Sequence, residues 1–259
     1  MIISFFEEFP TPENMRKVKQ LPFPTKLYIA APTLQEFERI KQQYSKNNEN
    51  NNIIEWVYWP ILSKKEGYWL SPFSNRTALQ RIFQELTKST PNSKNIPLML
   101  DLELPTTRNP LLYLTESWRF WLNRQLISNF IPNYKGKIYL CEYYPEGKIK
   151  DKILHWLGLH YPLQHKNIFI IKMLYHSIHQ FQEQFVHQEL QRGRKEWGDN
   201  FILGLGTIAT GINGNEPLLS PTQLHTDLTI ARQESISEVI VFRLGGLRKE
   251  YVKIVKKFV

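Results

Sequence analysis

Ile96-Pro-Leu-Met-Leu-Asp-Leu-Glu-Leu-Pro105 is an apolar run that carries two acidic residues near its end. Its length and composition are typical of a buried strand. Because side chains two positions apart on a strand point to the same face, Asp101 and Glu103 are expected to lie side by side. Two like charges in a poorly hydrated place raise the pKa of at least one carboxyl group, which lets such a pair divide acid and base roles. The segment therefore predicts a strand that ends at a chemically active site.

A structural role is the alternative for this acidic pair. Lys172 and Arg243 both lie in later strand-like runs and could each neutralise one of the carboxylates. Such an ion pair would tie strands together without taking part in any reaction.

Apolar strand-like runs alternate with amphipathic stretches along the chain, as in a parallel sheet with crossover helices. Thr33 and Ser220 stand where helix caps are expected, and the dense apolar stretch 110–130 is expected to break into two helices. Eight repeats in 259 residues fit an α/β fold made of one domain, a single (β/α)8 TIM barrel over residues 1–259. The expected strands are 2–7, 26–31, 53–59, 96–103, 137–142, 167–174, 200–206 and 238–244. The expected helices are 12–19, 33–45, 75–88, 110–130, 147–157, 178–197, 220–234 and 247–257.

Connections that enter strands differ from connections that leave them. The stretches 45–52 and 87–95 enter strands and are rich in Asn, Ser and Lys, whereas strand exits carry acids, aromatics, Pro and Gly. In a barrel these exits lie at the C-terminal face, where active sites of this fold are found. Acidic candidates for catalysis there are Asp101, Glu103, Glu8 and Glu142. Candidates for binding a sugar face, or alternatively for packing under loops, are Tyr58, Trp59, Trp69, Tyr143 and Tyr175.

The strand that ends in Asp101-Leu-Glu103 resembles the fourth-strand motif of TIM-barrel glycoside hydrolases such as the family 25 lysozymes and the chitinase-like enzymes. The resemblance implies that Glu103 is the general acid and that Asp101 orients it or stabilises charge on the substrate. Glycosidic hydrolysis needs a second carboxylate, for which Glu8 or Glu142 is expected. The chain departs from family 25 at the first strand, which ends in Phe5-Phe-Glu-Glu-Phe9 and lacks the aspartate of that family. The further upstream aspartates of the chitinase motif are missing too.

Three other functions compete with hydrolysis. Lys172 in an apolar strand has the desolvated amine that a Schiff-base lyase requires. Arg243 and the Gly-rich strand ends at 204–207 and 243–246 could hold the phosphate of a phosphosugar. A carbohydrate-binding barrel without turnover is the third alternative.

Composition narrows the class of protein. The net charge is +9, but the 33 Lys and Arg residues are spread along the chain, so no specific nucleic-acid partner is expected. The lone Cys141 excludes an internal disulfide, and no secretory signal or membrane span is recognised, so a cytoplasmic protein is expected. The pair His176 and His179 has ligand-like spacing without an adjoining acidic motif, so neither a metal nor another cofactor is expected. The expected partner is a carbohydrate or another small molecule, and nothing indicates the oligomeric state.

Overall fold

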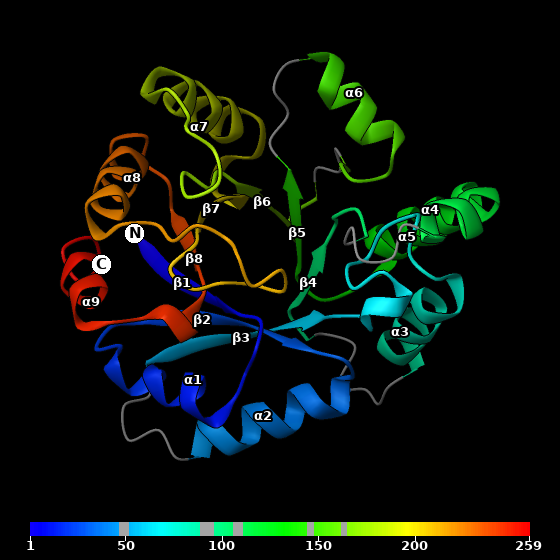
Figure 1. The fold of residues 1–259 in the computed structure, drawn as a ribbon, viewed down its shortest axis with the longest axis horizontal. Helices are drawn as coiled ribbons and strands as arrows, with labels where there is room; N and C mark the ends of the chain where they lie inside the picture. Colours follow the sequence, from blue (N-terminus) through cyan, green and yellow to red (C-terminus); the bar gives the residue numbers. More distant parts are fainter. Residues whose placement is uncertain (47–51, 89–95, 106–110, 144–147, 162–164) are drawn as a thin grey trace. The chain divides into compact units, whose positions relative to one another are not determined.

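A computed structural model describes residues 1–46, 52–88, 96–105, 111–143, 148–161 and 165–259. Within these residues, parallel strands close into a barrel in chain order from β1 to β8 (Figure 1). The predicted TIM-barrel architecture is therefore confirmed. The strands are β1 (Ile2–Glu7), β2 (Thr25–Ala31), β3 (Ile53–Pro60), β4 (Leu98–Asp101), β5 (Ile138–Tyr143), β6 (Ile168–Met173), β7 (Phe201–Gly206) and β8 (Glu238–Phe242).

The helices follow the predicted order with small shifts at their ends. The stretch expected to break does so, into α4 (Leu111–Thr115), a short 3-10 turn and α5 (Phe120–Asn133). Ser220 caps α8 as predicted, because its hydroxyl accepts a hydrogen bond from the backbone N–H of Gln223. Residues 47–51, 89–95, 110 and 147, which belong to predicted loops and helix ends, lie outside the described residues. The other helices are α1 (Pro12–Arg16), α2 (Leu34–Lys46), α3 (Arg76–Lys88), α6 (Lys148–Trp156), α7 (Glu183–Trp197), α8 (Pro221–Gln233) and α9 (Lys249–Val255).

Contacts divide the chain into two compact units, so the single domain over 1–259 stays a prediction. The first unit comprises Met1–Ala30, Glu38–Val57 and Ile170–Val259, and the second comprises Ala31–Phe37 and Tyr58–Phe169.

The first unit has a polar cluster at the start of β8. The buried carboxylate of Glu238 accepts hydrogen bonds from Ser4 (2.7 Å), Tyr28 (3.0 Å) and Lys26 (2.6 Å). These residues share one face of the sheet, since Ile2 pairs with Glu238 and Phe6 pairs with both Tyr28 and Phe242. The network satisfies a buried charge and ties β1, β2 and β8 together. In the same unit α8 and α9 lie side by side (Figure 1).

In the second unit, strand register decides which side chains face the helices. Tyr58 pairs with Leu98, and its ring packs on Phe37 of α2 with centroids 5.1 Å apart. That face of the sheet therefore looks toward the helices. Leu100 pairs with Leu140, so Leu140 and Glu142 belong to the helix-facing side. Asp101 pairs with Cys141, so Asp101, Cys141 and Tyr143 belong to the opposite face, which is the barrel interior.

Candidate functional site

Asp101 and Glu103 both lie close to the hydroxyl group of Tyr143. Asp101 is the buried last residue of β4, and the half-buried Glu103 follows it by two positions. The hydroxyl of Tyr143, at the end of β5, makes a side-chain hydrogen bond to Glu103. Burial first, and then the negative charges of Glu103 and Asp101, raise the pKa of Tyr143 far above its ordinary value. A phenol that stays protonated beside two carboxyl groups can hold one of them in place while donating a proton to a hydrogen bond.

The loop that carries Trp69 is hydrogen-bonded to the backbone of Asp101. The N–H of Leu70 donates to the carbonyl oxygen of Asp101 at 3.1 Å, which fixes the loop after β3 against the end of β4. Trp69 remains half-exposed, and its ring meets Tyr68 edge-on at 5.5 Å. The backbone at Leu70, one residue after the predicted sugar platform Trp69, is therefore fixed at the end of β4.

Tyr113 is a neighbour of the acids that sequence reasoning missed. It belongs to α4, and its hydroxyl donates to the carbonyl of Pro105 at 3.1 Å. It also contributes to the raised pKa of Tyr143, so the two phenols lie near each other. No strand-end signal marks Tyr113, because it stands inside an apolar helical stretch.

The adjacent aromatics of β3 go to opposite faces. Tyr58 is fully buried, and burial raises the pKa of its hydroxyl strongly, with Glu85 of α3 adding to the effect. A ring enclosed between helices cannot stack on a sugar, which corrects the prediction that Tyr58 binds substrate. Trp59, the next residue, belongs to the interior face and is 3% exposed.

Glu142 is also on the helix-facing side, where it is fully buried. Its carboxylate accepts a hydrogen bond from the backbone N–H of Tyr161 at 3.0 Å and lies 3.3 Å from Nε2 of His160. Nδ1 of His160 is in turn 2.6 Å from Asp151 of α6. This chain of contacts ties β5 to the segment around α6. It corrects the expectation that Glu142 is the second catalytic carboxylate.

In the first unit, the carboxylate of Glu7 binds to Arg243 and to the Gly-rich end of β8, which were expected to bind phosphate. Its fully buried carboxylate accepts hydrogen bonds from the Arg243 guanidinium (3.0 Å), the Gly245 backbone N–H (2.6 Å) and the Phe9 backbone N–H (2.8 Å). Asn14 of α1 adds another at 3.2 Å. Burial raises the pKa of Glu7, although Arg243 and the two N–H groups oppose that rise. Arg243 and the Gly-rich end of β8 therefore serve an internal anion, which corrects their assignment to a substrate or a phosphate.

Lys172 is buried in β6 and points away from the interior of its unit. Across the sheet, Lys172 is in register with Leu203 of β7, Val239 of β8 and Ile3 of β1, so these side chains share one face. Ile3 and Glu7 share a face, and Glu7 contacts α1, so Lys172 is on the helix-facing side. This position corrects the expectation that its amine meets a substrate at the interior.

Glu8 and Tyr175 occupy the interior side of the first unit. Glu8 is 3% exposed, and its carboxylate lies beside Gly211 and the ring of Phe242. Tyr175 follows β6 and packs over Gly206, with its ring 6.2 Å from that of Phe242. Both residues remain candidates for a site at the strand ends.

A histidine and an aspartate form a second polar pair in the first unit. Nδ1 of His176 lies 2.8 Å from the buried carboxylate of Asp227 in α8, and Gln223 donates to the same oxygen at 2.8 Å. His176 lines a cavity of about 540 Å³ together with Ser177. Within the described residues, no group of three or more His, Cys, Asp or Glu side chains could hold a metal ion.

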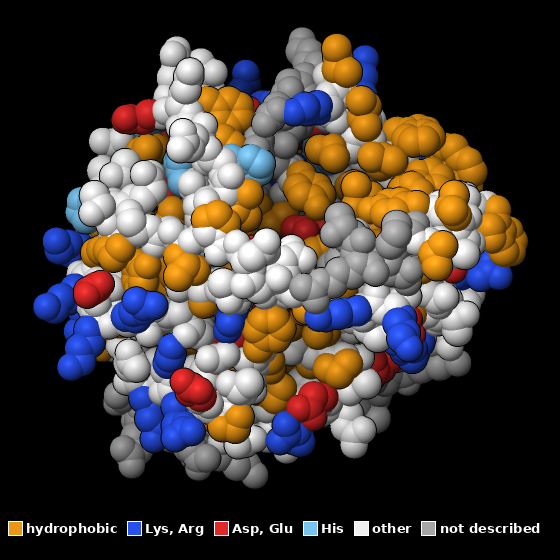
Figure 2. Space-filling view, viewed as in Figure 1, with side chains coloured by type: hydrophobic (Ala, Val, Ile, Leu, Met, Phe, Trp, Pro, Cys, Tyr) orange, Lys and Arg blue, Asp and Glu red, His pale blue; other side chains and the backbone are white. Residues whose placement is uncertain are grey.

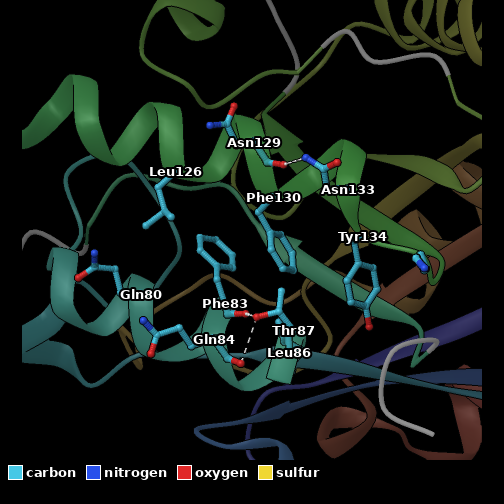
Figure 3. Close-up of a pocket in the computed structure, with 11 residues that line it drawn as sticks. Gln80, Phe83, Gln84, Leu86, Thr87, Leu126, Asn129, Phe130, Asn133 and Tyr134 are labelled. Atoms are coloured by element: carbon cyan, nitrogen blue, oxygen red, sulfur yellow. Dashed lines mark hydrogen bonds between the residues drawn. The ribbon is translucent and has the colours of Figure 1, made fainter. Parts of the chain in front are cut away.

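A cavity of about 530 Å³ in the second unit lies between α3 and α5 (Figure 3). Phe83 and Phe130 stack in its wall with centroids 4.3 Å apart, and Gln80, Asn129 and Asn133 surround them. None of the residues predicted for catalysis lines this cavity. Its amide-rich rim lies on the helix layer, so it is separate from the acidic pair.

No helix among the described residues combines the length and the hydropathy that a bilayer crossing requires.

Comparison with known proteins supports the fold. No protein-family model and no curated protein sequence matches the chain. The structure is similar to the PgaB (BpsB) glycoside hydrolase domain from Bordetella bronchiseptica, with a TM-score of 0.54 and 12% identity over 97% of this chain and 94% of that chain. It is also similar to a class V chitinase from Pseudomonas fluorescens Pf-5, with a TM-score of 0.55 and 9% identity over 98% of both chains. A D-tagatose 3-epimerase-like protein gives a TM-score of 0.51 and 12% identity over 99% of this chain and 95% of that chain. The expected resemblance to barrel glycoside hydrolases is therefore confirmed for the fold.

Proposed function

We propose that the chain is a glycoside hydrolase-like protein that acts on a carbohydrate at the ends of β4 and β5. The observation that carries the proposal is the hydrogen bond from Tyr143 to Glu103, with Asp101 close enough to raise the pKa of the same phenol. This arrangement joins a half-exposed carboxyl group to a buried one and orients the first through a fixed donor.

Glu103 is the proposed general acid. It would protonate the leaving oxygen as the bond to the anomeric carbon breaks. Water would supply the hydroxyl group at that carbon, and the proton that this water releases would return to the Glu103 carboxylate. Asp101 would stabilise positive charge on the sugar, and Tyr143 would hold Glu103 in the reactive orientation. Trp69 is the proposed platform for the sugar face. Trp59, on the interior face of β3, remains a further candidate for substrate contact.

The similarity to glycoside hydrolases supports the reaction class by analogy of fold alone. An epimerase-like protein with the same architecture is the competing analogy. The distinction is chemical, because hydrolysis cuts a glycosidic bond whereas epimerisation inverts one centre of a free sugar.

The test is turnover of a panel of α- and β-linked oligosaccharides, including chitin oligosaccharides, with products separated by chromatography. We expect cleavage by the wild-type protein and a loss of about 10²- to 10⁴-fold in kcat for Glu103→Gln. The matched control is Glu142→Gln, which changes a carboxylate of the helix-facing side and should retain kcat. Cleavage that survives Glu103→Gln, or epimerisation of free sugars without any cleavage, would contradict the proposal.

A further inference from the structure

Helices α4, α5 and α6 of the second unit, together with the 3-10 turn Ser117–Arg119, expose several large apolar side chains. Figure 2 shows hydrophobic side chains gathered over these helices. The exposed fractions reach 69% for Trp118, 58% for Trp121 and 54% for Trp156. We call this feature the tryptophan surface and define it by Leu114, Trp118, Trp121, Ile149, Ile153 and Trp156. Contiguous apolar surface of this kind marks an interaction site in a folded protein.

The tryptophan surface is held in place by contacts between helices. Trp156 of α6 packs on Phe120 of α5 with centroids 5.3 Å apart, and it meets Trp121 edge-on at 6.1 Å. The guanidinium of Arg124 donates to the carbonyl of His155 at 3.2 Å, which links the same two helices. The exposed rings therefore belong to a packed assembly of helices.

The charges beside the rings are basic. The guanidinium of Arg119 lies 4.2 Å above the ring of Trp118, and Lys150 and Lys152 of α6 are exposed. Of the acids near these rings, Glu116 is buried and lies 4.0 Å from Arg119, and Asp151 lies 2.6 Å from His160, so the positive charge offered at the surface comes mainly from the two lysines. A partner that covers this surface therefore meets apolar rings together with positive charge.

We propose that the tryptophan surface docks on an anionic lipid bilayer. Tryptophan rings flanked by aliphatic side chains suit the boundary between headgroups and acyl chains, and lysines beside them attract anionic headgroups. The ring planes of Trp121 and Trp156 are inclined at 85° to each other, so the two rings offer no common plane on which a polysaccharide chain could stack. A second copy of the chain would bring its own arginines and lysines against the same basic groups, which costs free energy. Lipid is therefore the occupant that matches both the shape and the charge.

The experiment is flotation of the purified full chain with vesicles at physiological salt. One set contains phosphatidylcholine alone, and the other contains phosphatidylcholine with about one third phosphatidylglycerol. We expect wild-type protein to float with the anionic vesicles and to remain largely unbound with the neutral ones. Leu114→Ser/Trp118→Ser should reduce the partition coefficient at least about tenfold, since both side chains are mostly exposed and their loss removes insertion without opening the core.

Two matched controls separate this surface from general stickiness. Ile54→Ser/Leu218→Ser removes side chains of 52% and 48% exposure elsewhere and should leave binding unchanged. Lys150→Glu/Lys152→Glu should weaken binding about tenfold or more, since each basic group near an anionic surface contributes about a fivefold factor. Lys253→Glu/Lys256→Glu in and after α9 lowers the net charge from +9 by the same four units and should have little effect.

Circular dichroism and thermal melting establish that each variant is folded. If Lys150→Glu/Lys152→Glu and Lys253→Glu/Lys256→Glu weakened vesicle binding equally, the proposal would be overturned, because binding would then follow net charge alone. Absence of flotation with anionic vesicles would overturn it as well. The proposal would also be overturned if the protein did not bind vesicles but dimerised, or adsorbed to an insoluble polysaccharide, in a way that depends on Trp118.

Discussion

The Tyr143 hydroxyl is hydrogen-bonded to Glu103, and the two residues come from neighbouring strand ends, β5 and β4. A neutral donor on a carboxylate stabilises its charged form, because the hydrogen bond is stronger to an anion than to the neutral acid. The phenol itself resists ionisation through burial and the two nearby acids. It therefore stays a donor across the pH range in which enzymes are assayed.

Replacing Tyr143 by Phe removes this donor while keeping the ring. Loss of the hydrogen bond favours the protonated form of Glu103, so the basic limb of the pH–rate profile should move to higher pH. We also expect kcat to fall by about tenfold as the orientation of the acid loosens. Initial rates measured from pH 4 to 9 test both expectations. An unchanged basic limb would show that this phenol does not influence the proposed acid.

Replacing Trp69 by Ala removes the half-exposed ring from the loop that is hydrogen-bonded to the end of β4. If the ring supports a sugar, KM should rise by about tenfold while kcat changes little, since the lost contact is made equally in ground and transition states. Trp156→Ala is the control, because it removes an exposed tryptophan of another surface. A fall in kcat at constant KM would contradict the role of a binding platform.

Replacing Glu142 by Gln tests a structural role. The fully buried carboxylate accepts from Tyr161 and contacts His160. We expect the free energy of unfolding to fall by about 1–3 kcal/mol, because a buried hydrogen-bond partner is weakened. Urea unfolding monitored by tryptophan fluorescence measures the change. Glu103→Gln, at a half-exposed position, should alter stability by less than about 0.5 kcal/mol. The reverse order of the two effects would contradict the assignment.

The Arg81–Glu66 pair predicts how stability depends on pH. Arg81 contacts both carboxylate oxygens at 2.9 and 3.2 Å, and its hydrogen bonds are the main reason why the pKa of Glu66 is lowered to about 2. A lowered folded pKa gives stabilisation that is complete above the ordinary value of 4.5 and disappears as pH falls through about 2.

Arg81→Ala should therefore cost about 0.5–1 kcal/mol near pH 7, a small value because the pair is largely exposed, and almost nothing near pH 2. Chemical unfolding at several pH values measures the difference. Lys41→Ala removes a pair with one contact of 3.5 Å to Glu38 and serves as control. A cost for Arg81→Ala that stays constant down to pH 2 would exclude the ionic origin.

The barrel could be predicted because strand existence depends on local apolar runs. Segment 96–103 became β4, although its regular pairing stops at Asp101, and the break within 110–130 followed from apolar density too great for one helix stripe. Helix ends were predictable where a cap residue was visible, as at Ser220.

The orientation of individual site residues could not be predicted from sequence. Strands of a parallel barrel are buried on both faces, so apolar residues do not alternate with polar ones and the pattern does not identify the interior. Trp59 and Tyr143 fall on the interior face, whereas their neighbours Tyr58 and Glu142 face helices. That choice depends on register between strands, which no single run of residues encodes. The ion pair between Glu7 and Arg243 could not be predicted for the same reason.

The Glu7–Arg243 contact joins positions separated by 236 residues. A chain leaving the ribosome exposes this glutamate 236 residues before its arginine is made. Until β8 is made, β1 lacks a partner on one edge, and Glu7 lacks the arginine that it binds in the folded protein. Such a state is prone to association with other chains. Closure of the ring is thus a late event in biogenesis, and truncation just before residue 243 should leave a protein that depends on chaperones.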